Sequence, residues 1–344
     1  MPLLQAMLRA ASQGPDAVLA VLDAPLRAAG FTPRTTRALP RAVRWSRGDA
    51  RLALSGHADV VPVGEGWRRD PHGGELAEGR VWGRGACDML GSIACFVAAA
   101  EATDAPCAIL LTTDEETGMK AAEHALGEGL LSGIEGVVIG EPTGMAVGIA
   151  EKGVLWLRLT ARGRNAHGSM PELGDNAAQR LVRALSRIEG MPLEGEHPLL
   201  GRATMNLGTL RAGDAVNQVP ASATAELDVR YLPGMRADDI VARLRERGGE
   251  AIEVEVHSQH LPFELSLDAP LARAALDAAS DGSGVRALGL PYGTEASKYA
   301  PAGIPCVILG PGEPGLAHTD RESIPLDALA RGVAAYARLL EAYR

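Results

Sequence analysis

Short runs of apolar residues that end in polar residues recur in the first and last thirds of the chain. Continuous apolar runs of this length are typical of strands buried on both faces, as in a parallel sheet with helices on each side. The four runs lie at residues 51–59, 107–116, 136–143 and 303–312, and the polar residues at or after their ends are His57, Glu115, Glu141 and His318.

Helical segments are predicted between these runs, for example over 92–102 and 121–131. The pattern therefore predicts an α/β fold with a mostly parallel sheet flanked by helices. Ligands of open α/β sheets bind beyond the carboxyl ends of the strands. Because each run carries its polar residues just past that end, we expect these residues to gather at one edge of one sheet.

The middle of the chain has a different pattern. Apolar residues alternate with polar ones from Val154, from Ala223 and from Ile252, and alternation of period two indicates half-exposed, antiparallel strands. Helical patterns at 176–188 and 237–247 would cover one face of that sheet. Since the first pattern resumes at Gly303, the predicted organisation is a catalytic domain and an inserted α+β domain. Their predicted ranges are 1–153 with 262–344, and 154–261.

Composition narrows the function classes. The 344 residues are 46% hydrophobic but only 3% aromatic, so the core must consist of Ala, Leu and Val. The net charge of −9 argues against a nucleic-acid binder. No run approaches the ~18 apolar residues of a membrane helix, and the start does not resemble a signal peptide, so we expect a cytoplasmic protein. Little before Ala20 resembles a full first helix.

The four cysteines form no CxxC pair and lie among apolar neighbours, which indicates buried reduced thiols. Cys87 is next to Asp88, but a carboxylate there explains a metal site better than the thiol does. The cysteines are Cys87, Cys95, Cys107 and Cys306.

Taken one at a time, the polar residues have ordinary explanations. His57 is followed two positions later by Asp59, which could hold the second imidazole nitrogen of a metal ligand or could simply cap a loop. Asp88 precedes an apolar helix and could be its N-cap. Glu141 precedes Pro142, which favours extended geometry at the strand end, and His318 follows a glycine-rich loop.

Glu115 and Glu116 are adjacent just past an apolar run. A solvated loop is the simple explanation, since neighbouring carboxylates repel each other. A functional explanation needs both residues: one carboxylate binds a metal ion, and the other takes a proton from a water molecule.

The conjunction favours a metal site. Two histidines and three or four carboxylates are predicted at the same sheet edge, a ligand set that suits zinc and also cobalt or manganese. One ion rarely needs five protein ligands, whereas two ions roughly 3.5–4 Å apart that share a carboxylate do. We therefore predict two divalent ions, most simply zinc, and hydrolysis of an amide bond.

At this point the motifs resemble those of the M20 metallopeptidase and deacylase family, and they occur in the order of that family over nearly the whole chain. The resemblance implies that Asp88 bridges two ions, that His57 and Glu141 hold one and that Glu116 and His318 hold the other. Asp59 would orient His57, and Glu115 would be the general base. The matching segments are GHADVVP, GRGACDMLG, TTDEETG, VIGEPT, RNAHGSMP, NQVPASATAELDVR, YGTEAS and GPGEPGLAHTD.

The resemblance also gives the inserted domain a role, as a lid that often carries the dimer interface. His167 resembles the histidine that stabilises the oxyanion in a neighbouring subunit's site, where negative charge develops; a turn histidine is the alternative. Asn217 and Arg230 resemble residues that contact substrate, Arg230 through a carboxylate. A strand-pairing Asn and a surface Arg remain the alternatives.

Substrate is the least determined feature. The resemblance places Thr294 and Glu295 nearer to the acetylornithine deacetylase branch than to the desuccinylase branch, with Glu295 as a partner for a cationic side chain. We therefore expect a small N-acylated amino acid of arginine or lysine biosynthesis. A dipeptidase or carboxypeptidase of the same family is the next alternative, and an inactive scaffold is disfavoured because no ligand is missing. One departure is Leu90, which replaces the lysine common in the family.

Overall fold

The computed structural model describes residues 1–280 and 284–343. The chain forms two compact units. The first consists of Met1–Ile149, Leu265–Leu288 and Thr294–Arg344, and the second of Ala150–Glu264 and Gly289–Gly293.

A mixed sheet with a parallel centre is the middle layer of the first unit. Its strand order is β1-β2-β6-β3-β7-β19-β8, with β18 paired to β8. β6, β3, β7 and β19 run parallel, whereas β1, β2 and β8 pair antiparallel with their neighbours. Every residue of the four parallel strands is buried, as the apolar runs predicted. The strands are β1 (Thr32–Thr35), β2 (Ala42–Arg47), β3 (Leu52–His57), β6 (Cys107–Thr112), β7 (Gly136–Ile139), β8 (Val147–Glu151), β18 (Ala287–Leu290) and β19 (Cys306–Ile308).

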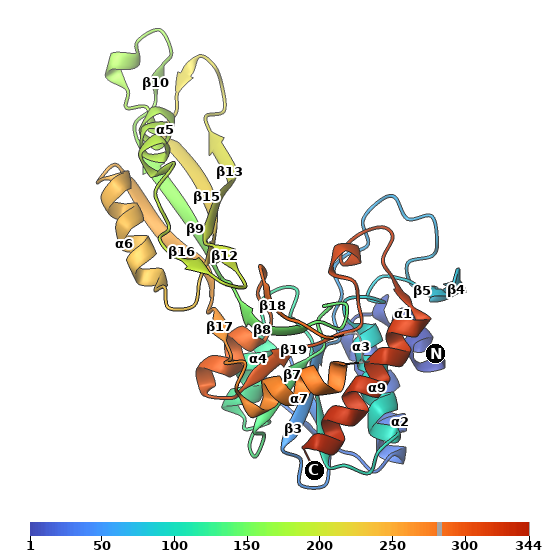
Figure 1. Cartoon of the computed structure of the whole chain (residues 1–344). Helices are drawn as coiled ribbons and strands as arrows, with labels where there is room; N and C mark the ends of the chain where they lie inside the picture. The colour runs from blue at the N-terminus through green and yellow to red at the C-terminus, as the bar shows by residue number, and fades with distance from the viewer. Residues whose placement is uncertain (281–283, 344) are drawn as a thin grey trace. The chain divides into compact units, whose positions relative to one another are not determined.

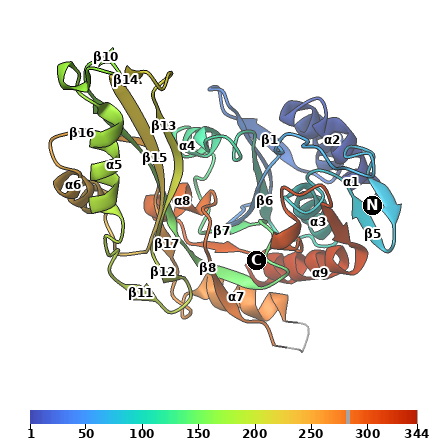
Figure 2. The ribbon, with the colours of Figure 1, turned by 90° about the horizontal axis from the view of Figure 1, so that it is seen from above.

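Helices cover both faces of this sheet, which explains why its strands lack polar alternation. α3, α7 and α9 pack together over one face, with α1 against α3, and α4 and α8 contact each other over the other (Figures 1 and 2). A small sheet, β20-β5-β4, lies beside α9. These elements are α1 (Pro2–Ala11), α2 (Pro15–Ala28), α3 (Leu90–Glu101), α4 (Lys120–Gly127), α7 (Pro270–Ala279), α8 (Ala296–Tyr299), α9 (Leu326–Ala342), β4 (Glu75–Ala77), β5 (Arg80–Trp82) and β20 (Ser323–Pro325).

The N-terminal segment is more regular than expected. The expectation that little before Ala20 is helical was wrong, because α1 and α2 occupy most of the first 28 residues. Leu4, Met7 and Leu8 are fully buried and have the spacing of one helix face. Pro2 and Pro15 each stand in a first helical turn, where proline is favoured.

The second unit is built on the antiparallel sheet β13-β15-β9-β16, as the alternating pattern predicted. α5 and α6 pack on the same side of it (Figure 1), over buried residues such as Leu157 and Leu227. Asn176 caps α5 by accepting a hydrogen bond from the Gln179 N–H. The elements are β9 (Gly153–Arg162), β10 (Ala166–His167), α5 (Ala177–Ile188), β11 (Glu196–His197), β12 (Gly201–Arg202), β13 (Thr204–Ala212), β14 (Gln218–Val219), β15 (Ser222–Tyr231), α6 (Ala237–Gly248), β16 (Ile252–His260) and β17 (Phe263–Glu264).

Among the described residues, no helix combines the length and the apolar character needed to cross a bilayer.

Candidate metal centre

Strand ends in the first unit bring the predicted ligands together. His57 is the last residue of β3, and Glu141 follows β7 by two residues. Glu116 lies in the loop after β6, and His318 in the longer loop after β19. Because β6, β3, β7 and β19 are parallel neighbours, their carboxyl ends meet at one edge of the sheet.

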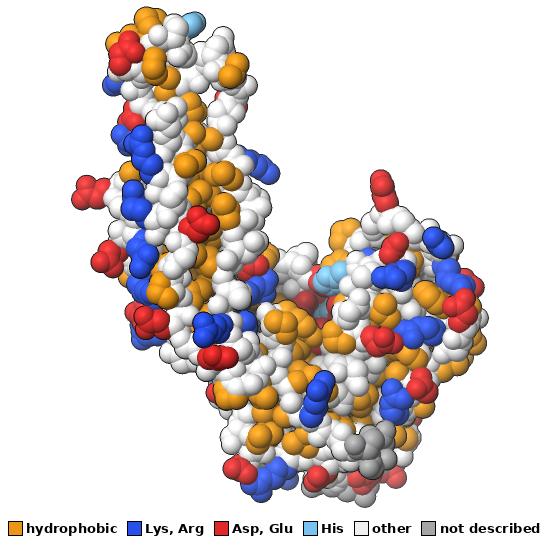
Figure 3. Space-filling model, turned by 45° about the horizontal axis from the view of Figure 1, so that its top comes forward, with side chains coloured by type: hydrophobic (Ala, Val, Ile, Leu, Met, Phe, Trp, Pro, Cys, Tyr) orange, Lys and Arg blue, Asp and Glu red, His pale blue; other side chains and the backbone are white. Residues whose placement is uncertain are grey.

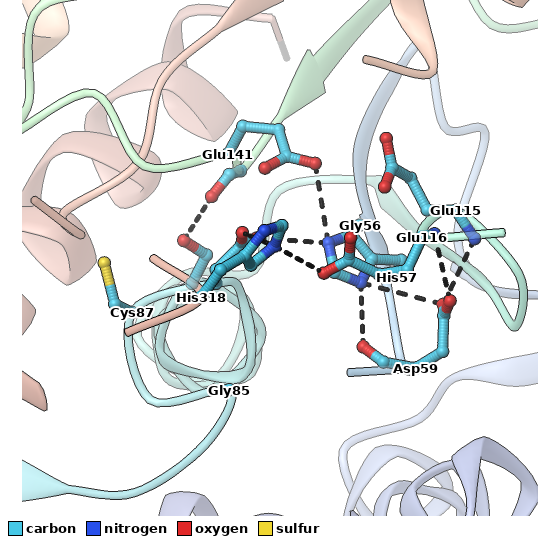
Figure 4. A network of polar contacts seen from close by, with 12 residues as sticks. Gly56, His57, Asp59, Gly85, Cys87, Glu115, Glu116, Glu141 and His318 are labelled. Atoms are coloured by element: carbon cyan, nitrogen blue, oxygen red, sulfur yellow. Dashed lines mark hydrogen bonds and ion pairs between the residues drawn. The ribbon is translucent and has the colours of Figure 1, made fainter. Parts of the chain in front are cut away.

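Asp88 contacts both histidines of this cluster, and Figure 4 shows His57 and His318 with the carboxylates around them. Its Oδ1 lies 3.2 Å from His57 Nε2, and its Oδ2 lies 3.1 Å from His318 Nε2. It does not cap α3, as the simpler interpretation had it, because the N-cap position is Met89. Each oxygen of Asp88 therefore faces a different histidine, which is the arrangement that a bridging carboxylate needs.

Each histidine also faces a second carboxylate. His57 Nε2 is 3.5 Å from Glu141 Oε1, and His318 Nε2 is 3.0 Å from Glu116 Oε1. Two groups of candidate ligands thus share Asp88, and a third group joins His57 to Glu115 and Glu116; within each group the candidate ligand atoms lie within 4.8 Å of one another. The two groups around Asp88 have the composition expected of two ions that share a carboxylate.

The electrostatics of the cluster also suit cations. No lysine or arginine is ion-paired to its carboxylates in the part of the chain that the structure describes. Burial, together with the charge of Asp88, raises the pKa of Glu141 well above its usual value. Crowded buried carboxylates without a fixed cation are costly. With two imidazoles as the remaining donors, the set fits zinc or a similar divalent ion.

The pKa values of the two histidines are raised as well. Burial favours neutral imidazole at His57, but the hydrogen bond to Asp88 and the charge of Glu141 outweigh burial and raise its pKa well above the usual value. Hydrogen bonds to Asp88 and Glu116 raise the pKa of His318 to about 10. Divalent ions bound at the same carboxylates would compete with protons for these imidazoles.

Asp59 acts on the cluster through two different groups. Its backbone carbonyl lies 2.9 Å from His57 Nδ1, closer than its carboxylate at 3.7 Å. A carbonyl can only accept, so Nδ1 carries a proton, and Nε2 faces Asp88 and Glu141. The carboxylate of Asp59 accepts the backbone N–H groups of Glu115 (3.2 Å) and Glu116 (3.1 Å).

Glu115 lies in the same cluster, in a group with His57 and Glu116. Burial, and after it the charges of Glu116 and Asp88, raise its pKa well above the usual value, although His57 opposes this shift. A carboxylate with a raised pKa is suited to taking up a proton near neutral pH. The geometry therefore gives two groups of ligands and one nearby carboxylate that can act as a base.

Comparison with known sequences identifies the architecture. The sequence profile described as peptidase family M20/M25/M40 matches residues 53–342. The chain belongs to this family. It is therefore an M20 hydrolase whose relatives act on amide bonds.

Two relatives of this M20 hydrolase have named activities. The chain is 31% identical to an acetylornithine deacetylase of Myxococcus xanthus, over 92% of this chain and 89% of that protein. It is 29% identical to a succinyl-diaminopimelate desuccinylase of Acidiphilium cryptum, over 99% of this chain and 97% of that protein.

Solved structures agree on the M20 fold. An M20 family metallo-carboxypeptidase of Sulfolobus solfataricus superposes with a TM-score of 0.82 at 18% identity, covering 99% of this chain and 98% of that one. A dinuclear metal-binding M20 peptidase of Bacillus subtilis superposes with a TM-score of 0.67 at 17% identity, covering 92% and 89%. At these identities the likeness concerns the fold.

Thr294 and Glu295 lie inside the first unit of the M20 chain rather than on its surface. Glu295 is 1% exposed, and its Oε2 accepts hydrogen bonds from Ser55 Oγ (3.3 Å) and Tyr299 OH (3.1 Å). Thr294 is fully buried and accepts the Ala296 N–H. A substrate would need a rearrangement to reach the Glu295 carboxylate, so its predicted contact with a cationic side chain stays a prediction.

The remaining substrate candidates belong to the second unit of the M20 chain. His167 pairs with Gln218 in the β10–β14 ladder, and its Nδ1 is 2.7 Å from Ser169 Oγ. The Asn217 carbonyl accepts the N–H of Gly168, which brings Asn217 beside the His167 turn. Arg230 is paired with Asp228, two residues before it on β15.

Two further residues of the M20 pattern are explained by burial. Cys87 donates its S–H to the Glu313 carbonyl, and burial raises the pKa of this thiol, so it remains protonated and outside the ligand set. Leu90 is fully buried in the core of the first unit, where a lysine would leave its charge without water.

Sequence reasoning missed Glu322, although it lies only four residues after His318. It is fully buried, and its contacts reach the loop that carries Asp88. The available signal was a charged residue immediately before the short segment Ser323–Pro325.

Proposed function

We propose that this M20 hydrolase is a two-metal deacylase that removes the acyl group from an N-acylated amino acid, with N-acetylornithine as the first substrate to test. The observation that carries the proposal is the position of Asp88, whose two oxygens face His57 and His318 at 3.2 and 3.1 Å.

The ligand roles follow from the two groups of side chains. His57 and Glu141 would hold one ion, Glu116 and His318 the other, and Asp88 would bridge them. Two divalent ions would supply the positive charge that polarises the amide carbonyl and makes water a better acid. Zinc suits these ligands, and cobalt or manganese would also fit.

Glu115 has the proton-transfer role in this proposal. It would accept a proton from the attacking water and donate it to the departing amine. Its high pKa in the buried site supports such a carboxylate. Asp59 would hold Glu115 and Glu116 in place by their backbone N–H groups.

The second unit is proposed to be a lid that carries substrate-binding groups. His167 would stabilise the negative charge of the tetrahedral intermediate, and its imidazole is exposed. Asn217 and Arg230 would contact the substrate. Arg230 would have to exchange its bond with Asp228 for a substrate carboxylate, a bidentate pairing that guanidinium favours.

We also propose that the lid forms a homodimer. β13 is an edge strand of the four-stranded sheet, and such edges invite pairing with another chain. A groove between α5 and β13 is lined by apolar side chains, of which Val182, Leu207 and Leu210 are exposed. Figure 3 shows a band of hydrophobic side chains along the second unit.

N-acetylornithine is placed before dipeptides because the deacetylase relative is 31% identical to this chain over 89% of its length, whereas the solved peptidases are 18% and 20% identical. A role in arginine biosynthesis would follow from that substrate, and one in lysine biosynthesis from the desuccinylase substrate.

The test is a hydrolysis panel with zinc, cobalt or manganese added. It compares N-acetylornithine, N-succinyl-diaminopimelate, other N-acetylated amino acids and dipeptides by kcat/KM. The proposal predicts the highest value for an N-acylated amino acid. A higher kcat/KM for dipeptides would indicate a peptidase instead of a deacylase. If no substrate is hydrolysed with any of the metals, the proposed deacylase activity is contradicted.

A further inference from the structure

Glu322 is a buried charged residue outside the ligand set. Its side chain is fully buried, and that of its ion-pair partner Arg84 is almost so. Two charges removed from water are a costly arrangement unless each is paired and hydrogen-bonded. The contacts of the Glu322 side chain therefore indicate which part of the structure it holds in place.

Strand pairing brings Glu322 to the loop that carries Asp88. β20 begins at Ser323, which pairs antiparallel with Trp82 at the end of β5. The Gly83 N–H then donates to the Glu322 carbonyl at 3.1 Å. The side chain of Glu322 is consequently directed at the residues that follow β5.

One carboxylate oxygen of Glu322 collects three backbone donors. Oε1 accepts the N–H groups of Gly85, Cys87 and Asp88, each at 3.0 Å. The other oxygen, Oε2, accepts from the Arg84 guanidinium. Bonds from backbone N–H groups to a charged oxygen are stronger than bonds to a neutral one.

The loop is shaped for this contact. Gly85 has a φ of +89°, in the region that favours glycine, and a Cβ there would lie 2.7 Å from Val60 Cγ1. The backbone can therefore curl around the Glu322 oxygen only with glycine at this position. Three donors converging on one anion make a concave loop of the kind that holds anions elsewhere.

Glu322 thereby links Asp88 and His318, two of the ligands proposed for one ion. It holds the N–H of Asp88 directly, and it belongs to the same short segment as His318. Asp88 Oδ2 and His318 Nε2 lie 3.1 Å apart. A shift of the Asp88 backbone would change this distance and the bridging position together.

We propose that Glu322 is a positioning residue that fixes the bridging carboxylate of Asp88 against His318, so that both ions bind tightly. This inference rests on the proposed two-metal function. The competing explanation is that the Arg84–Glu322 pair only stabilises the fold.

The Arg84 and Glu322 variants separate these explanations. Glu322→Met keeps a side chain of similar size but removes both acceptor oxygens, so the loop N–H groups of Gly85, Cys87 and Asp88 lose their partner. Arg84→Met removes the ion pair but leaves Glu322 its three backbone donors. The double variant Arg84→Met/Glu322→Met leaves no unpaired buried charge, so it remains informative if the single Glu322 variant fails to fold.

The measurements are zinc titration by calorimetry, thermal unfolding without metal, and kcat for the best substrate. We expect Glu322→Met and the double variant to bind zinc about 10- to 100-fold more weakly, the usual effect of losing a residue that orients a ligand. Arg84→Met should unfold at a lower temperature but keep its zinc affinity within about threefold.

Glu128→Met is the matched control, because Glu128 also accepts backbone N–H groups, those of Arg37 and Ala38, in the first unit. It should leave zinc affinity unchanged. The role of Glu322 is overturned if its variants bind zinc as the wild type does, or if Arg84→Met loses affinity equally. Wild-type protein that binds no divalent ion would instead overturn the two-metal function, and this inference with it.

Discussion

The Asp59 carboxylate accepts the backbone N–H of Glu116 at 3.1 Å. Asp59, which follows β3, thus holds a proposed ligand that follows β6, and it does so through the main chain. The His57 ring is oriented by the backbone carbonyl of the same residue. Removing the Asp59 carboxylate should therefore loosen the Glu116 loop and leave the orientation of His57 intact.

For Asp59→Ala we expect zinc affinity and kcat to fall about 10- to 100-fold. The measurements are zinc calorimetry and steady-state kinetics. Asp70→Asn is the control, because Asp70 also accepts a loop N–H, that of His72, in the same unit. If the zinc affinity and kcat of Asp59→Ala equal those of the control, the contact between Asp59 and the Glu116 loop does not contribute to metal binding or catalysis.

Substitution of Glu115 should separate chemistry from metal binding. Glu115→Gln is expected to keep two ions per chain, because Glu115 is in neither of the two groups around Asp88. Its kcat should fall by about 10²- to 10⁴-fold, since the proton acceptor is lost. Metal analysis and kinetics check this, with Glu123→Gln as a surface control. Full turnover, or loss of the ions, would contradict the role of Glu115 as base.

Glu295 predicts a pH dependence of stability in the metal-free protein. Burial raises its pKa to about 7 from the usual 4.5, although Thr112, His57 and Tyr299 oppose the shift. Between these values the folded state holds a proton that the unfolded state has released. The free energy of unfolding therefore falls as pH rises from 4.5 to 7, by up to about 1.4 kcal/mol per pH unit.

Glu295→Gln removes this ionisation. We expect the free energy of unfolding of the variant, minus that of the wild type, to increase as pH rises through the same window. Urea denaturation with chelator present, at several pH values, measures the difference. A difference that does not change with pH would show that Glu295 does not titrate there.

The proposed lid dimer predicts the effect of a charge on β13. Leu210→Arg places a guanidinium at an exposed apolar position beside the groove, so the protein should become monomeric in sedimentation experiments. Leu76→Arg adds the same charge at an exposed position of the first unit and should have no effect. A wild-type monomer at micromolar concentration would exclude the dimer.

The fold was predictable where burial leaves a simple pattern. β3 and β6 read as apolar runs because both faces of each strand are covered, and their polar ends located His57 and the Glu115 loop. In the second unit, the alternation of apolar and polar residues along β9 indicated that one face of this strand is buried. Because parallel strands end at the same edge of a sheet, the predicted residues could be assigned to one edge without knowing any distance between them.

Other features were outside the reach of local pattern. Asp88 looked like a helix cap, because nothing in the sequence shows that His57 and His318 come to its two oxygens. Glu295 looked available to a substrate, yet Ser55 and Tyr299, which bind it, come from other parts of the chain. Such side chains are placed by tertiary packing, which single-sequence patterns do not contain.

The most direct test of the two-metal centre is the number of divalent ions bound by the wild type and by an Asp88→Ala variant. Zinc calorimetry and metal analysis of the wild type should give two ions per chain. Asp88→Ala should lose both, because its oxygens face His57 and His318. A wild type that binds one ion or none, or an Asp88→Ala variant that still binds two, would contradict the two-metal centre.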